Sequence, residues 1–311
     1  MSRFFETLKE VGRSQLVPNE APSNGNPNTA ETSGLDSFPQ FETAEAIPLP
    51  VVEPPEPEMP SCELPRMSIS PEELLETYAP RRSGFTVKTV RVNLDKNQPL
   101  IPHTGDAVIV ERYRRLRTKI QQQHATTPIN SLLVASPGPG EGKTVTAVNL
   151  ALSFAMLPAY KVLIVDGDLR KGSIAKWFGL SNMQGLSNLI DGSATLSDVV
   201  LKSEELPFHF MLHGNSERPA TELLTSPALQ KCIRQMSQHF DLVLVDSPPV
   251  NLIADAQMLA GSCDGVLLVA RAFTTTNKAF EKAMHDLLPF RIIGTILNGG
   301  MRGERYQKYK Y

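Results

Sequence analysis

The sequence has few cysteines, few aromatic residues and no long apolar run. Three cysteines occur among 311 residues, and none of them has CxxC spacing. Such sparse, odd-numbered usage is typical of a reducing compartment and argues against a disulfide framework or a cysteine-rich zinc site. No apolar segment is long enough to cross a bilayer, and the N-terminus mixes charged with apolar residues, unlike a signal peptide. These absences predict a soluble, cytoplasmic protein.

The charge balance also lacks an excess of either sign. Lysine and arginine total 31 against 33 acidic residues, which gives a net charge of -2. This balance argues against nucleic acid as a partner. The six histidines form no metal-ligand pattern, so His209 and His213 are predicted to serve the fold. With 41% hydrophobic residues the chain can bury a substantial core.

Basic residues are absent from residues 14–65. The same stretch contains eleven prolines and acids from Glu20 to Glu63. Low hydrophobicity, uncompensated negative charge and abundant proline cannot offset the entropy lost on ordering. Residues 1–104 are therefore predicted to be an N-terminal region that is mostly a disordered, acidic and proline-rich tether.

The middle of the chain has the pattern of a phosphate-binding loop. An apolar run at 131–135, short enough for one buried strand, precedes a glycine-rich segment and an apolar, helix-like stretch at 145–157. Glycines let backbone N–H groups face a phosphate, a lysine reaches the outer phosphates, and a threonine offers its hydroxyl to Mg²⁺. A plain turn between strand and helix is the alternative. The predicted nucleotide-binding residues are Gly138, Pro139, Gly140, Glu141, Gly142, Lys143 and Thr144.

One position departs from the strict motif. Pro137 stands where the general pattern has its first glycine, five residues before Gly142. The donors that matter lie further along the loop, so the nucleotide interpretation holds. The departure argues against the common GTPase type of loop.

Short apolar runs alternate with helical stretches through the rest of the chain. This pattern predicts a doubly wound, mostly parallel α/β domain over residues 105–300. A helix is expected over 106–122, because Ile109, Tyr113, Leu116 and Ile120 recur at helical spacing. Strands are expected at 85–92, 131–135, 161–165, 208–212, 241–245, 265–270 and 291–297.

Carboxylates follow two of these strands directly. Asp166 and Asp168 come after one strand, and Asp246 comes after another. In such a sheet the ligand lies beyond the carboxyl ends of the strands, and buried carboxylates are costly unless a cation or hydrogen bonds receive them. Any one of these acids could instead cap the next helix. Their convergence beside a phosphate loop favours Mg²⁺ bound with a nucleotide.

Taken together, these motifs resemble the Walker A, A′ and B set of the bacterial tyrosine kinases, which are autophosphorylating P-loop kinases of capsule and exopolysaccharide systems. The matching segments are 136–144, the run ending at 166–170 and the run ending at 246–249. The helix with Glu111, Arg114 and Arg117 is similar to that family's ExxRxxR helix, which the resemblance implies in self-association. The similarity covers roughly residues 105–311 and implies the P-loop NTPase architecture.

The resemblance also implies roles for the site residues. ATP and Mg²⁺ would be the cofactors, with Lys143 neutralising phosphate charge. Thr144, Asp168 and Asp246 would hold Mg²⁺, directly or through water. Asp166 would orient and deprotonate the incoming tyrosine. Arg170 would either stabilise phosphate charge or hold Asp168, and the sequence leaves both possibilities open.

The C-terminal residues 301–311 combine tyrosines with positive charge. Tyr306, Tyr309 and Tyr311 stand among four basic residues and one acid, which predicts a flexible tail attracted to an acidic site. A basic terminus that merely contains tyrosines is the alternative. By resemblance this cluster is the enzyme's own substrate. Its short tether predicts that it enters the site of a neighbouring subunit in a homo-oligomer.

Two other functions stay open. A partition-type or cell-division ATPase switch would share the fold, but those proteins carry a lysine four residues before Gly142, where this chain has Gly138. A kinase-like protein could also regulate a polysaccharide export complex by its assembly state alone. The resemblance further implies a chain-length-determining membrane protein, whose cytoplasmic segment activates the kinase at the inner face of the plasma membrane. A tyrosine phosphatase would be a second partner.

Overall fold

The computed structural model describes residues 86–94, 98–101 and 106–300. The predicted acidic tether and the tyrosine tail lie outside the described residues, so both stay predictions. Among the described residues, no helix combines the length and hydropathy needed to cross a lipid bilayer.

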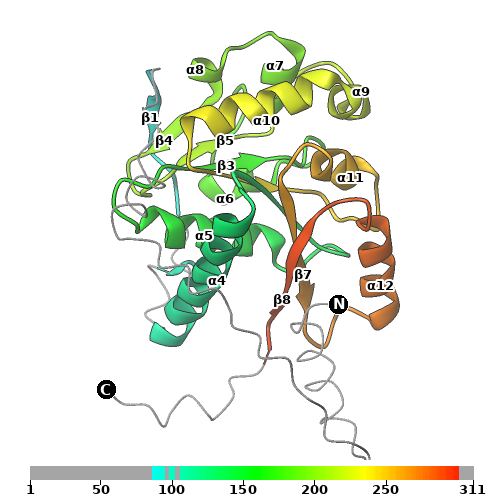
Figure 1. Ribbon diagram of the computed structural model, residues 1–311. Helices are drawn as coiled ribbons and strands as arrows, with labels where there is room; N and C mark the ends of the chain where they lie inside the picture. The colour runs from blue at the N-terminus through cyan, green and yellow to red at the C-terminus, as the bar shows by residue number, and fades with distance from the viewer. Residues whose placement is uncertain (1–85, 95–97, 102–105, 301–311) are drawn as a thin grey trace, which may run out of the picture. The chain divides into compact units, whose positions relative to one another are not determined.

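The described chain is built on an eight-stranded sheet (Figure 1). Neighbouring strands in it are parallel with one exception: the second and third strands of the spatial order given below are antiparallel. This confirms the predicted doubly wound, mostly parallel α/β class. In spatial order the strands are β1 (Lys88–Val90), β4 (Leu201–Ser203), β5 (His209–Met211), β3 (Val162–Asp166), β6 (Leu242–Asp246), β2 (Ser131–Ala135), β7 (Gly265–Arg271) and β8 (Ile292–Asn298).

Helices cover both faces of this sheet, and each face has its own apolar core (Figure 1). One core lies under α4 (Ala107–Thr126), α5 (Lys143–Ala155) and α6 (Ser173–Phe178). The central strands β2, β3 and β6 are buried along their whole length, because both of their faces are covered. The other core lies under α7 (Leu186–Asp191), α8 (Leu196–Val199), α9 (Ala220–Thr225), α10 (Pro227–His239), α11 (Asp255–Ala260) and α12 (Asn277–Asp286).

The predicted helix over 106–122 forms and continues to Thr126. Its N-cap is Asp106, whose carboxylate accepts a hydrogen bond from the backbone N–H of Val108 at 2.9 Å. Ile120 is buried and Tyr113 and Leu116 are partly buried, as the spacing of the apolar stripe predicts. This face packs α4 against α5, the helix that follows the glycine-rich loop.

Residues before the predicted domain start at 105 belong to the same folded unit. β1 pairs with β4, and Leu100 and Ile101 are buried in the core beneath α5. Asn149 on α5 fixes this segment, since its amide donates to the Pro99 carbonyl at 2.8 Å and accepts from the Ile101 N–H at 2.8 Å. The sheet therefore includes chain that lies N-terminal to the predicted boundary.

Two short strands differ from the sequence-based expectation. The strand expected at 85–92 is confined to Lys88–Val90 at the sheet edge. β4 was not predicted at all, and it supplies the antiparallel pairing with β5. β4 has three residues, too few to show a recognisable apolar period.

Candidate active site at the carboxyl ends of the strands

The glycine-rich loop joins β2 to α5 and ends in two glycines with left-handed backbone. Gly140 has φ +74° and Gly142 has φ +95°, a region that residues with a side chain rarely adopt. A Cβ at Gly142 would also lie 2.0 Å from Nδ2 of Asn298. Gly142 directly precedes α5, so the loop places its backbone N–H groups at the positive end of that helix.

The carboxylate of Glu141 holds the loop in shape from inside. Glu141 is 4% exposed, and it accepts a hydrogen bond from the Gly138 N–H at 3.0 Å. Its second carboxylate oxygen accepts from the hydroxyl of Thr275, beyond the end of β7, at 2.6 Å. The Glu141 carbonyl accepts from Nδ2 of Asn298, at the end of β8, at 3.0 Å. The predicted loop residue Glu141 thus links the phosphate loop to two neighbouring strand ends.

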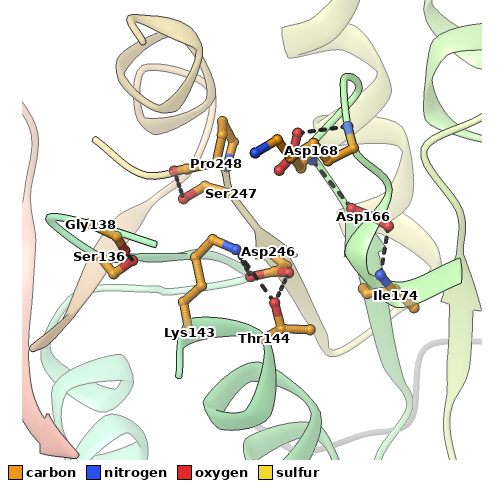
Figure 2. Close-up of polar contacts among 11 residues, drawn as sticks. Ser136, Gly138, Lys143, Thr144, Asp166, Asp168, Ile174, Asp246, Ser247 and Pro248 are labelled. Atoms are coloured by element: carbon orange, nitrogen blue, oxygen red, sulfur yellow. Dashed lines mark hydrogen bonds and ion pairs between the residues drawn. The ribbon is translucent and has the colours of Figure 1, made fainter. Parts of the chain in front are cut away.

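Lys143, Thr144 and Asp246 form one cluster (Figure 2). Thr144 donates its hydroxyl proton to Oδ2 of Asp246 at 2.6 Å. Nζ of Lys143 lies 3.8 Å from the other carboxylate oxygen of Asp246 and 3.4 Å from the Thr144 hydroxyl oxygen. The fold therefore brings Asp246 to two adjacent loop residues that lie 102 and 103 positions before it in the sequence.

Asp166 and Asp168 lie on the next strand end (Figure 2). Asp166 is fully buried and accepts from the backbone N–H of Ile174, in the first turn of α6, at 2.8 Å. Asp168 is 3% exposed and accepts from the backbone N–H groups of Arg170 at 3.3 Å and Lys171 at 3.1 Å. Both acids therefore accept hydrogen bonds from backbone N–H groups, as the helix-capping alternative expects. Both also lie beside the cluster of Lys143, Thr144 and Asp246.

Burial shifts the protonation of two of these acids. It raises the pKa of Asp166 to about 6 and that of Asp246 to about 7, in each case chiefly because the charged form loses its water. Lys143 opposes both shifts, and the carboxylate of Asp168 adds to both. Three buried acids thus lie around the ammonium group of Lys143, so the site favours binding of additional positive charge.

The donor set fits Mg²⁺ held with a nucleotide. Oδ1 of Asp246 is buried and accepts no hydrogen bond from the described residues, and the Thr144 hydroxyl lies beside it. Hydroxyl and carboxylate oxygens are the ligands that Mg²⁺ prefers. The described residues contain no group of three His, Cys, Asp or Glu side chains that could hold an ion by themselves. Water and phosphate oxygens would complete such a site, as is usual for Mg²⁺.

Arg170 is engaged by a residue that the sequence analysis did not single out. Its guanidinium donates to both carboxylate oxygens of Asp255 on α11, at 2.7 and 3.2 Å. Its backbone N–H donates to Asp168 at 3.3 Å. Arg170 therefore fixes the Asp168 turn to α11 through a bidentate ion pair.

His213 also lies next to the site, although the sequence analysis predicted that it serves only the fold. Its Nδ1 lies 3.9 Å from Oδ2 of Asp166, and it accepts or donates no hydrogen bond among the described residues. The ring packs against Gly172, where a Cβ would lie 2.2 Å from it. No spacing links His213, Asp255, Thr275 or Asn298 to the phosphate loop, because only the folded sheet brings them there.

The predicted oligomer-interface residues divide into two environments on α4. Glu111 accepts from Arg114 at 2.9 Å within the helix, and both side chains are partly exposed. Arg117 instead donates to the Ser153 carbonyl near the end of α5, and burial lowers its pKa. Self-association through these residues stays a prediction, and Tyr306, Tyr309 and Tyr311 lie outside the described residues.

Comparisons with known proteins agree with this geometry. The sequence profile of the AAA domain family matches residues 133–285. Tyrosine-protein kinase YwqD of Bacillus subtilis (strain 168) is 32% identical over 203 residues, covering 65% of this chain and 85% of that protein. Tyrosine-protein kinase ptk of Acinetobacter johnsonii is 30% identical over 218 residues, covering 68% of this chain but 30% of that longer protein.

A solved structure shows the same relationship. The kinase domain of the Escherichia coli tyrosine kinase ETK superposes with a TM-score of 0.62 at 30% identity, covering 78% of this chain and 96% of that chain. The fold and the loop define a P-loop nucleotide-binding protein. The chain belongs to the bacterial tyrosine-protein kinase family and is, by that membership, a protein-tyrosine kinase.

Proposed function

We propose that this kinase transfers the γ-phosphate of ATP to its own C-terminal tyrosines, Tyr306, Tyr309 and Tyr311, in trans within a homo-oligomer. The observation that carries the proposal is the convergence of Lys143, Thr144 and Asp246 with two further buried acids at adjacent strand ends. Phosphoryl transfer depends on positioning and on charge neutralisation, and this cluster supplies both.

Lys143 and the loop N–H groups bind the phosphates. Lys143 already points its ammonium into the acid cluster, 3.8 Å from Asp246. Thr144, Asp168 and Asp246 would hold Mg²⁺, which when bound neutralises phosphate charge. Asp246 is kept in place by the Thr144 hydroxyl, so its free oxygen faces the site. Arg170, tied to Asp255, keeps the Asp168 turn in position.

Asp166 is the proposed base for the tyrosine hydroxyl. A general base works best when its pKa lies near the working pH, and burial moves the pKa of Asp166 to about 6. Its carboxylate also accepts from the Ile174 N–H, which fixes its orientation. Asp166→Asn should therefore lower the transfer rate while ATP binding stays close to that of the unchanged protein.

The decisive experiment is intact mass spectrometry after incubation with Mg²⁺-ATP. Added phosphates should disappear in Lys143→Met and in a variant with all three tail tyrosines changed to Phe. Lys176→Met, an exposed lysine on α6, is the matched control and should keep its phosphates. ATP hydrolysis without added mass would instead favour the partition-type ATPase switch. A protein that does neither would be retested with the cytoplasmic segment of a chain-length-determining membrane protein.

Transfer in trans has its own test. A Lys143→Met subunit that keeps its tyrosines is mixed with an active subunit that lacks them. Phosphate should appear on the inactive subunit. If it stays unmodified while the unchanged protein is phosphorylated, transfer occurs within one chain and the trans proposal is wrong.

The proposed cellular role is regulation of exopolysaccharide or capsule polymerisation and export. Phosphorylation would turn the positive tail negative, which should loosen docking and separate the subunits. A tyrosine phosphatase would reverse the change, and a membrane protein of the chain-length-determining type would hold the kinase at the inner face of the plasma membrane. An identical assembly mass before and after phosphorylation would contradict the switch. Unchanged polymer length in a Lys143→Met strain would contradict the cellular role.

A further inference from the structure

Phe273 is an unusual residue in the loop between β7 and α12. It is 82% exposed, the most exposed of the large apolar side chains in the described part of the chain. Its φ of +61° is left-handed, a conformation that bulky residues seldom adopt. An aromatic side chain held in a strained turn and turned towards solvent is not explained by core packing, and such outliers cluster at ligand sites.

The turn that carries Phe273 is fixed to the phosphate loop. Arg271 donates to the Gly140 carbonyl at 2.9 Å, and Thr275 donates to Glu141 at 2.6 Å. The turn is closed by the Thr275 N–H, which donates to the Arg271 carbonyl at 2.9 Å. The Ala272 N–H donates to the Asn298 carbonyl at 2.8 Å, which joins the turn to the end of β8. Phe273 therefore stands at the tip of a rigid turn beside the loop.

The strand order says which end of a nucleotide this turn faces. β2, which leads into the phosphate loop, lies between β6 and β7. The acids proposed to act around the terminal phosphate, two as Mg²⁺ ligands and one as the base, lie at the ends of β3 and β6 on one side of β2: Asp168, Asp246 and Asp166. A nucleotide with its terminal phosphate on that side extends its ribose and base over the opposite side, above the ends of β7 and β8. The Phe273 turn and Asn298 occupy that side.

We infer that Phe273 is the stacking surface for the purine base of the nucleotide. The inference rests on the proposed ATP binding and adds a specificity residue to it. An aromatic ring offers a face to the base, and a single contact of this kind contributes about fivefold to a hundredfold in affinity. Arg271 and Thr275 act as positioning residues for the turn, since both contact the phosphate loop.

The test compares ATP with inorganic tripolyphosphate, which has the phosphates but no base. Both are titrated calorimetrically, with Mg²⁺, into the full-length protein and into Phe273→Ala, Phe273→Trp and Leu288→Ala. Leu288 is 67% exposed and is the matched control. We expect Phe273→Ala to weaken ATP binding about tenfold and to leave tripolyphosphate binding unchanged. Phe273→Trp and Leu288→Ala should bind ATP as the unchanged protein does.

Other results would overturn the inference in distinguishable ways. Equal affinity of the unchanged protein for ATP and tripolyphosphate would show that no base contact exists, while leaving the proposed kinase intact. Equal losses for both ligands in Phe273→Ala would show that Phe273 acts through the phosphate loop. Failure of the unchanged protein to bind either ligand would overturn the proposed function together with the inference.

A second variant separates stacking from a structural role. Phe273→Gly removes the ring and relieves the left-handed strain. It should keep or raise the thermal midpoint while ATP affinity still falls about tenfold. A lowered midpoint with unchanged ATP affinity would show that the ring serves the fold instead.

Discussion

Asp166 and Asp246 stand opposite each other at the carboxyl ends of the adjacent parallel strands β3 and β6. Both carboxyl groups are fully buried, and burial raises the pKa of each, while the carboxylate of Asp166 adds to the shift of Asp246. Two neighbouring buried carboxyl groups lower the stability of the folded chain. The fold alone does not account for them, so we attribute this loss of stability to the site. The pH dependence of stability should report it directly.

Without ligand, the protein should lose stability as pH rises from about 4 to about 7. Burial raises the pKa of Asp246 from 3.8 to about 7, so in this window the folded chain holds more protons than the unfolded chain. The free energy of unfolding then falls with rising pH, by about 1–3 kcal/mol. Asp246→Asn should reduce this change with pH. Urea denaturation at pH 5 and pH 8, without nucleotide or Mg²⁺, gives the free energy of unfolding of both proteins at each pH. An equal change with pH in the two proteins would contradict the assignment of the raised pKa to Asp246.

Gly142→Ala should abolish tight nucleotide binding. An alanine at position 142 would have to adopt a φ near +95°, and its Cβ would lie 2.0 Å from Nδ2 of Asn298. Gly192→Ala is the matched control, because Gly192 has φ +81° but nothing within 4 Å of an added Cβ. Both variants should lose about 1 kcal/mol of stability from backbone strain. ATP affinity should fall more than about tenfold in Gly142→Ala alone, and a similar fall in Gly192→Ala would show that strain acts on binding indirectly.

A double-mutant cycle on Arg170 and Asp255 decides between the two roles left open for Arg170. If the ion pair fixes the Asp168 turn, Arg170→Ala and Asp255→Ala should slow autophosphorylation by similar factors, and the double variant should be no slower. Each change should also cost about 1–2 kcal/mol of stability, because the 43% exposure of Arg170 weakens the pair. A much larger kinetic loss for Arg170→Ala alone would show that its guanidinium acts on phosphate.

Arg114 and Arg117 should respond differently to alanine. Arg117 donates to the Ser153 carbonyl between α4 and α5, so Arg117→Ala should lower the free energy of unfolding by about 1–2 kcal/mol. Arg114 is exposed and pairs only with Glu111 among the described residues, so its removal should change stability by less than about 0.5 kcal/mol. If α4 is the subunit interface, Arg114→Ala should still reduce assembly mass in light scattering. Unchanged mass in Arg114→Ala would argue against that interface.

The parts of the site that the sequence predicts share one property: each lies directly after a buried apolar run. The phosphate loop, Asp166, Asp168 and Asp246 could be placed because the carboxyl ends of parallel strands meet at one edge. The order of the strands did not follow from the sequence, since short strands such as β4 carry no periodic pattern.

The supporting residues of the site could not be predicted for a different reason. Asp255 resembles an ordinary helix-start acid, and Thr275 and Asn298 resemble ordinary turn residues in the sequence. Their importance arises from contacts across 85 to 157 positions of chain. Arg117 shows the converse, because a motif that the sequence assigned to subunit contact also serves packing inside the subunit.

The two hydrogen bonds between Asn149 and residues 99–101 determine where the chain can be shortened. A truncated chain beginning at 105 would lose both hydrogen-bond partners of a buried amide and the strand that covers β4. The uncovered β4 would then offer unpaired backbone groups to other molecules, a common route to aggregation. A chain cut just before residue 86 keeps both hydrogen-bond partners of Asn149 and the pairing of β1 with β4, so we expect it to aggregate less than the chain that begins at 105.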